Sequence, residues 1–217
     1  MNKRLFIALT LILLLTTYKL GNEINLNLGV KKIIIENNNI LSEKQVKEDL
    51  LFLYEKNLFF LNNNSIKKQI DKNSLIESFK IKKIYPNTVK IQVFEKEPVF
   101  ILQNKKKRYY FTKKNLLINY TNIKKFEDLP IVFAEKENFE KFYSELKKIK
   151  FPIKIVKAFY FFDSKRWDLL TVNNKTIKLP IKDYDISLKN FINIQKKESF
   201  KKYTIFDYRI TDQLILK

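Results

Sequence analysis

The chain has 217 residues, 45% hydrophobic and 14% aromatic, and its 43 Lys and Arg against 23 Asp and Glu give a net charge of +20. This composition supplies enough apolar side chains for one ordinary domain or two small ones, and argues against global disorder. Because the chain has no His, no Cys and only 2 Gly, it excludes Ser-His-Asp and Cys-His catalysis, zinc sites of the usual ligand types, disulfides and glycine-rich phosphate-binding motifs.

The N-terminus, MNKRLFIALTLILLLTTYKL, places two cations before an apolar run that extends to about Tyr18. Such a run is either a signal peptide or a short membrane anchor, and a span needs roughly 17–25 residues. The following TTYKLGNEINL lacks a small-x-small cleavage site. We therefore predict an uncleaved transmembrane signal-anchor over residues 5–20, with residues 1–4 as a cytoplasmic tail.

Residues 28–97 are predicted to form a first domain that begins with a strand at 30–36. Asparagines at 37–39 predict a turn, and the segment from Ser42 to Gln45 has the pattern of a helical capping box. Behind it, apolar residues at helical spacing predict one buried stripe. These residues are Val46, Leu50, Leu53 and Tyr54.

The rest of this domain is predicted to hold a second helix after Asn64 and then two strands. The first of these strands, Leu75 to Tyr85, is followed by a Pro86-Asn87 turn and by alternating apolar residues from Val89 to Val93. The order strand, helix, helix, strand, strand indicates an α+β layer with both helices on one face of a three-stranded sheet.

Residues 98–217 are predicted to form a second, mainly antiparallel β-sheet domain with flanking helices. Pro98 marks the boundary, since proline cannot donate to a sheet ladder. Short apolar runs alternate with lysine and asparagine. The periodicity between Phe139 and Ile149 predicts a helix, and Ser187 is expected to cap another.

A hairpin is predicted around Asn173-Asn174, with Leu170 opposite Ile177 and with Trp167 on the other face. We expect Trp167 to act in packing rather than in binding. The final segment, YTIFDYRITDQLILK, is predicted to be one strand in which Asp207 and Arg209 share a face and can pair.

Two stretches resemble a known family when they are read in order. NSLIESFKIKKIYPNTVKIQVFEKEPV is similar to a POTRA domain, and Arg166-Trp167-Asp168 followed by Asp207-Tyr208-Arg209 resembles the second domain of the FtsQ/DivIB cell-division proteins. With the apolar N-terminus, the resemblance covers nearly the whole chain.

The resemblance implies a non-enzymatic scaffold of the division septum, without a cofactor, that crosses the inner membrane once and has a periplasmic body. It implies binding of an FtsB- and FtsL-like pair by β-strand augmentation, and contact with FtsK-, FtsW- or FtsI-like proteins. The implied partner face consists of Arg166, Trp167, Tyr203, Ile205, Asp207, Arg209, Ile210 and Asp212.

Three other functions are alternatives to this one. A POTRA-bearing secretion or outer-membrane assembly component normally carries tandem repeats or a long run of alternating strands. An enzyme acting on an anionic polymer requires a carboxylate pair, and the sequence singles out none. The charge also fits a nucleic-acid binder, but it is mostly dispersed lysine with only four arginines, whereas base and phosphate recognition favours arginine. We therefore predict neither a nucleic-acid nor a small-molecule ligand.

Overall fold

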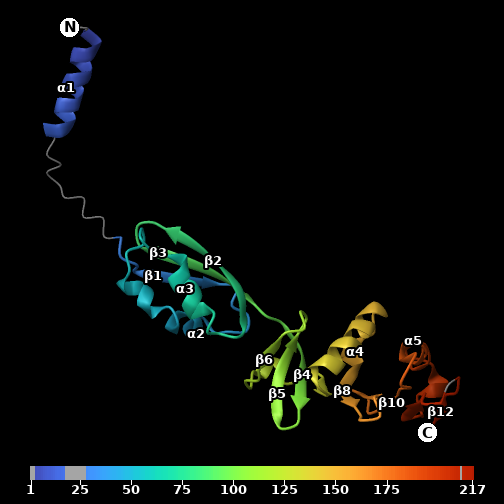
Figure 1. The fold of residues 1–217 in the computed structure, drawn as a ribbon. Coiled ribbons are helices and arrows are strands. Elements are labelled where there is room, and N and C mark those ends of the chain that lie inside the picture. Colours follow the sequence, from blue (N-terminus) through green and yellow to red (C-terminus); the bar gives the residue numbers. More distant parts are fainter. Residues whose placement is uncertain (1–2, 18–27, 211) are drawn as a thin grey trace.

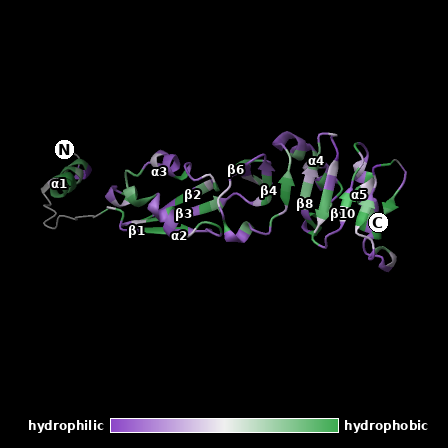
Figure 2. Ribbon diagram, turned by 90° about the horizontal axis from the view of Figure 1, so that it is seen from below, coloured by the Kyte–Doolittle hydropathy of each residue, from purple (hydrophilic) through white to green (hydrophobic). Residues whose placement is uncertain are grey.

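The computed structural model describes residues 3–17, 28–210 and 212–217. Helix α1 (Lys3–Thr17) is mostly hydrophobic along its length (Figure 2), and its leucines are largely exposed, with Leu15 at 73%. Within the described ranges, no helix is long and apolar enough to span a membrane. The anchor over residues 5–20 stays a prediction, and its last three residues lie outside the described ranges.

A small three-stranded sheet follows, with the strand order β1-β3-β2. Strand β3 (Thr88–Glu95) lies in the middle, parallel to β1 (Lys32–Glu36) and antiparallel to β2 (Ile76–Ile84). Two helices lie between β1 and β2 in the chain, α2 (Glu43–Glu48) and α3 (Asn63–Ile70). The predicted order of strand, helix, helix, strand, strand is thereby confirmed (Figure 1).

The start of α2 also agrees with the sequence pattern. The Ser42 hydroxyl accepts a hydrogen bond from the Gln45 amide at 3.2 Å, and the Gln45 side chain accepts one from the Ser42 amide at 2.9 Å. Burial of Tyr54 was predicted wrongly, because its side chain is 42% exposed. The α-helix ends at Glu48, and a separate 3-10 turn (Leu51–Glu55) breaks the helical spacing that placed Tyr54 on the buried stripe.

Glu95, at the end of β3, fixes the loop that connects β1 to α2. Its carboxylate accepts hydrogen bonds from three consecutive backbone amides, at 2.9 Å from Asn39 and at 2.8 Å from both Ile40 and Leu41. Lys125, from the other part of the chain, donates to the Asn39 carbonyl at 3.5 Å. The loop held by Glu95 is therefore also a point of contact between the two parts of the molecule.

The second part of the chain forms one large sheet, whose strand order is β12-β11-β10-β9-β8-β7-β4-β5-β6. Its strands are β4 (Pro98–Asn104), β5 (Lys107–Thr112), β6 (Leu117–Asn119), β7 (Ile131–Phe133), β8 (Val156–Phe161), β9 (Trp167–Thr171), β10 (Thr176–Lys178), β11 (Ile205–Asp207) and β12 (Ile215–Leu216). The sheet is mixed, with antiparallel pairings in the majority, as the sequence predicted.

Helices α4 (Lys136–Lys148) and α5 (Tyr184–Ile194) flank this sheet and bury aromatic side chains against it. Phe139 of α4 lies 4.8 Å from Phe100 between ring centroids, in an edge-on arrangement. The expected cap at Ser187 is wrong, because α5 begins at Tyr184. Asp183 precedes it with a left-handed backbone (φ 54°), which turns the chain into the helix one turn earlier.

The core of the small sheet continues into the large one. Four buried residues of the second part belong to the same apolar cluster as the small sheet and its helices. They are Ile101, Tyr110, Ile118 and Phe126. Burial raises the pKa of the Tyr110 hydroxyl, which donates to the Thr121 carbonyl. Apolar contact thus joins the two sheets beside the loop that Glu95 holds.

Candidate partner-binding face

The hairpin that follows Arg166 pairs one residue away from the predicted register. Leu169, rather than Leu170, lies opposite Ile177. Thr171 donates its amide to the Lys175 carbonyl at 2.8 Å and so closes a three-residue loop, in which Asn174 has φ 57°. The extra residue compared with a two-residue turn shifts the register, and it places Leu169 and Ile177 together on the buried face.

Trp167 lies on this same buried face and is 5% exposed, so the prediction that it points to the face opposite Ile177 is wrong. Its ring stacks on Phe142 of α4 with the centroids 4.4 Å apart and the planes 16° from parallel. The expectation that Trp167 acts in packing agrees with this position. Its side chain contributes to the core between β9 and α4, and it leaves little surface for a partner.

The opposite face of the same strands carries a row of charged side chains. The pairing register sets Lys178 of β10 between Asp168 of β9 and Asp207 of β11. Residues directly opposite each other in register point to the same face of a sheet. Asp168 and Asp207 are each only 7% exposed, so both carboxylates need charged or hydrogen-bonding partners.

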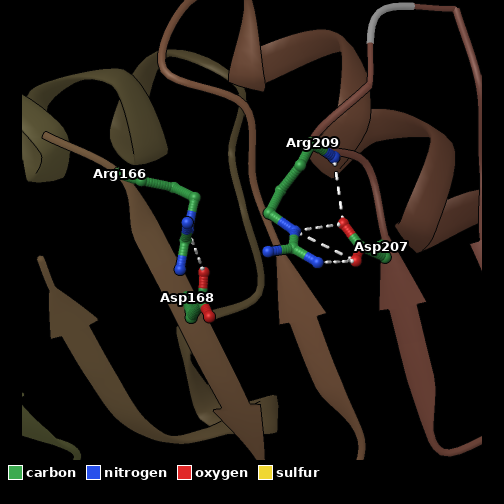
Figure 3. A network of polar contacts seen from close by, with 4 residues as sticks. All are labelled: Arg166, Asp168, Asp207 and Arg209. Atoms are coloured by element: carbon green, nitrogen blue, oxygen red, sulfur yellow. Dashed lines mark hydrogen bonds and ion pairs between the residues drawn. The ribbon is translucent and has the colours of Figure 1, made fainter. Parts of the chain in front are cut away.

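Two arginines that flank these strands supply the partners, Arg166 just before β9 and Arg209 just after β11 (Figure 3). Arg166 Nε lies 3.0 Å from Asp168 Oδ1, and Arg209 binds Asp207 through Nε at 2.8 Å and Nη2 at 2.6 Å. The hydrogen bond from Arg209 holds the pKa of the Asp207 carboxyl below its ordinary value, against the opposing effect of burial. The sequence-based pairing of Asp207 with Arg209 is confirmed.

Arg166 and Arg209 are not equally available to another molecule. The Arg166 side chain is 23% exposed, and its guanidinium also lies over the Phe162 ring, 4.8 Å from the centroid. The Arg209 side chain is 44% exposed although its fork binds Asp207. Arg209 is therefore the more accessible cation of this charged row.

The final segment does not form the single strand that the sequence predicted. β11 has three residues and lies inside the sheet, between β10 and β12. Ile210 and Asp212 fall in the connection to β12, where Asp212 has φ 60°, and Tyr203 lies before β11 with its ring 6.4 Å from that of Phe200. Tyr203–Asp212 is therefore not a sheet edge, and the edge at this end is β12.

The hydrogen bonds of β12 show which of its backbone groups face outward. Lys217 exchanges two backbone bonds with Ile205, at 3.1 and 3.0 Å, and Leu216 lies opposite Phe206. Along an antiparallel pair, successive residues direct their N–H and C=O groups alternately toward the neighbour and away from it. The backbone groups of Leu216 therefore point away from β11, as they do on a strand edge that can accept another strand.

A groove of about 700 Å³ lies next to this edge, between α5 and the connection from β11 to β12. Its rim carries Ile181, Ile186 and Ile210, which are 57%, 65% and 51% exposed. Arg209 and Leu214 line the same groove and connect it to the charged row and to β12. Ile181 and Ile186 are not among the residues that the sequence predicted for a partner face. The exposure of Ile186 could have been predicted, because it lies outside the buried stripe of α5. That stripe consists of Leu188, Phe191 and Ile194.

These features are suited to binding another protein. Within the described ranges, no group of three or more Asp and Glu side chains is placed to hold a metal ion. Each carboxylate of the charged row is held by its own arginine. An outward-facing backbone edge, an accessible arginine and an apolar groove are the elements of a site that receives an extended segment.

Two family models match this chain in the order of its two sheets. Residues 28–96 match the POTRA domain, FtsQ-type, and residues 101–209 match the model for the C-terminal part of cell division protein FtsQ/DivIB.

Whole proteins with similar sequences are also cell-division proteins. A cell division protein FtsQ from Rickettsia conorii is 29% identical over 198 residues, which cover 89% of this chain and 72% of that protein. FtsQ from Rickettsia typhi is 26% identical over 188 residues, with 85% and 70% covered. DivIB from Clostridium acetobutylicum is 31% identical over 87 residues, with 40% and 34% covered.

Proposed function

The chain belongs to the FtsQ/DivIB family of bacterial cell-division proteins, and we propose that it is a non-enzymatic scaffold of the septum-assembly complex. In this role it binds a partner pair similar to FtsB and FtsL through the end of its large sheet. The partner adds a strand to β12. The observation that carries the proposal is the outward-facing backbone of Leu216 at the edge of that sheet.

The residues around β12 indicate which kinds of side chain the added partner strand carries. Exposed isoleucines of the groove favour apolar side chains just beyond the added strand. Arg209, the accessible arginine, favours a carboxylate at that end of the partner. Of the residues implied by family resemblance, Arg209 and Ile210 fit such contacts directly. Arg166 and Asp207 hold the charged row in place.

The same proposal includes attachment to the inner membrane. The N-terminal apolar segment anchors the chain as a single span, with residues 1–4 in the cytoplasm and the two sheets in the periplasm, enriched at the septum. Support comes from the apolar sequence of α1 behind Lys3 and Arg4, and from membership of a cell-division family. Contacts with FtsK-, FtsW- or FtsI-like proteins belong to this scaffold role.

Two substitutions at one position test the strand-addition site. Leu216→Pro removes the outward N–H, whereas Leu216→Ala removes the side chain but keeps that N–H. We expect the full-length chain and Leu216→Ala to capture the FtsB–FtsL pair in a detergent pull-down, and Leu216→Pro to lose capture at least about tenfold. Circular dichroism of each variant reports whether the sheet is retained. Equal capture by the two folded variants would refute strand addition at β12.

A further inference from the structure

Three aromatic side chains project from one end of the small sheet. Phe59, Phe60 and Tyr85 are 61%, 80% and 55% exposed, and we call this group the aromatic tip. Single exposed apolar residues are common on protein surfaces, but a group of large ones marks an interaction site. The phenylalanines contact each other edge-on, with centroids 5.2 Å apart.

Hydrogen bonds hold the loop of the tip in this position. The Lys83 ammonium donates to the backbone carbonyls of Phe59 and Leu61, at 3.1 and 3.0 Å. The Leu58 amide donates to the Leu28 carbonyl at 2.7 Å, so the loop lies beside the first residue described after α1. The two phenylalanines are thus presented outward by a loop that is fixed on both sides.

Exposed lysines lie at the same end of the small sheet as the aromatic side chains. Lys31 and Lys56 lie at the same end of the sheet, since the Lys31 amide binds the Asn87 carbonyl at 2.8 Å and the Val30 amide binds the Lys56 carbonyl at 3.1 Å. Glu55 is the acidic residue next to Lys56 in the chain. Aromatic rings combined with cations are typical of surfaces that lie at the headgroup level of a bilayer, and lysine is attracted to anionic lipid.

The length of the chain keeps the tip close to the N-terminal helix. Leu28 lies eleven positions after Thr17, the end of α1, with ten residues between them. A chain of that length spans at most about 40 Å when it is fully extended. An anchored α1 therefore confines the tip to the neighbourhood of the bilayer surface. This step rests on the membrane attachment proposed above.

We propose that the aromatic tip docks on the surface of the membrane that anchors the chain, with its phenylalanines at the headgroup level and its lysines against anionic lipid. The other end of the small sheet leads into β4, and the C-terminal strands lie at the far end of the molecule from the tip (Figure 1). Docking at the tip would therefore direct the β12 edge away from the bilayer, toward its partners.

Fluorescent labels of the full-length chain in vesicles test this inference. The chain has no cysteine, so Asn64→Cys, near the tip, and Lys106→Cys, on the β4–β5 hairpin, each accept one environment-sensitive fluorophore. The vesicles contain phosphatidylglycerol and phosphatidylcholine, with nitroxide-bearing lipids as quenchers. We expect the label at position 64 to be quenched at least about threefold more strongly than the label at position 106.

Matched variants separate the tip from other aromatic surfaces. Replacing Phe59 and Phe60 by serine should abolish the extra quenching at position 64, whereas Phe162→Ser, at an aromatic side chain that is 40% exposed elsewhere, should leave it unchanged. Pure phosphatidylcholine or high salt should reduce the quenching, because the lysine contribution is electrostatic.

The possible failures are distinguishable. A chain that floats with the vesicles but shows equal quenching at both labels retains its proposed anchor and refutes the docking of the tip. Loss of partner capture in the double serine variant, without lipid quenching in the parent, would also overturn the inference and assign the tip to a protein. A chain that does not float with the vesicles contradicts both the anchor and the docking.

Discussion

The carboxylate of Glu95 gives the most quantitative prediction of this structure. In Glu95→Ala, the amides of Asn39, Ile40 and Leu41 lose their acceptor. Asn39 is exposed and its amide returns to water, whereas Ile40 and Leu41 are at least partly buried. A hydrogen bond to a charged group contributes about 1.5–3 kcal/mol, and allowing for partial solvent access we expect a loss of about 2–4 kcal/mol in unfolding free energy.

Urea unfolding of the full-length chain in detergent, followed by circular dichroism, measures this loss. Hydrogen exchange of the 38–42 segment should accelerate at the same time, because the amides of Asn39, Ile40 and Leu41 lose the acceptor that protects them. The matched control is Glu36→Ala, which breaks a surface ion pair to Lys90 of 2.6 Å whose side chains are 40% and 32% exposed. Such a pair is worth about 0–1 kcal/mol. Equal unfolding midpoints for the two variants, with unchanged exchange, would refute the role of Glu95.

Three further substitutions test the large sheet. Trp167→Ala removes a ring stacked at 4.4 Å on Phe142 and should cost about 3–5 kcal/mol in urea unfolding; a cost under about 1 kcal/mol would contradict its core position. Asn174→Val should lower the melting temperature because φ 57° disfavours a β-branched residue, while Asn174→Gly should not; equal melting of the two would argue against the three-residue loop. Because Arg209 lowers the pKa of Asp207, their ion pair stabilises the fold at pH values above about 4, which is the pKa of Asp in the unfolded chain. This stabilisation is lost as the pH falls through the lower pKa of Asp207 in the folded chain. The difference in stability between the parent and Asp207→Asn should therefore shrink between pH 6 and pH 2, and a pH-independent difference would contradict the ion pair.

The elements of the small sheet were predictable because their signals are local. The capping box at Ser42 and the alternation from Val89 to Val93 each specify one element by itself. Burial of the strand and helix stripes then follows from stacking the helices on the sheet. The burial of Tyr54 was predicted wrongly because the helix ends at Glu48, and no residue in the sequence indicates that end.

Turns were harder to predict from the sequence because of the amino-acid composition of the chain. Described residues with positive φ are all Asn, Asp or Lys, since the chain has only 2 glycines. Such residues are abundant throughout the chain, so they do not stand out as turn signals in the way glycine does. The left-handed residues Asn174 and Asp212 accordingly shifted the hairpin register and divided the last strand, against prediction.

The candidate site was predictable in part. The pairing of Asp207 with Arg209 followed from their spacing, because residues two apart share a face of a strand. The edge at β12 and the isoleucine groove were not predictable, because they depend on which strand ends the sheet and on how α5 packs. Both are properties of the tertiary fold.

Hydrogen exchange at single amides is the most direct test of strand addition at β12. In the proposed complex the Leu216 N–H bonds to the added strand, whereas the Lys217 N–H already bonds to Ile205 at 3.1 Å in the chain alone. Exchange at Leu216 should slow at least about tenfold when the FtsB–FtsL pair binds. Exchange at Ile118, on the β6 edge at the opposite end of the sheet, should stay unchanged. Unchanged exchange at Leu216 in a saturated complex would contradict strand addition at β12.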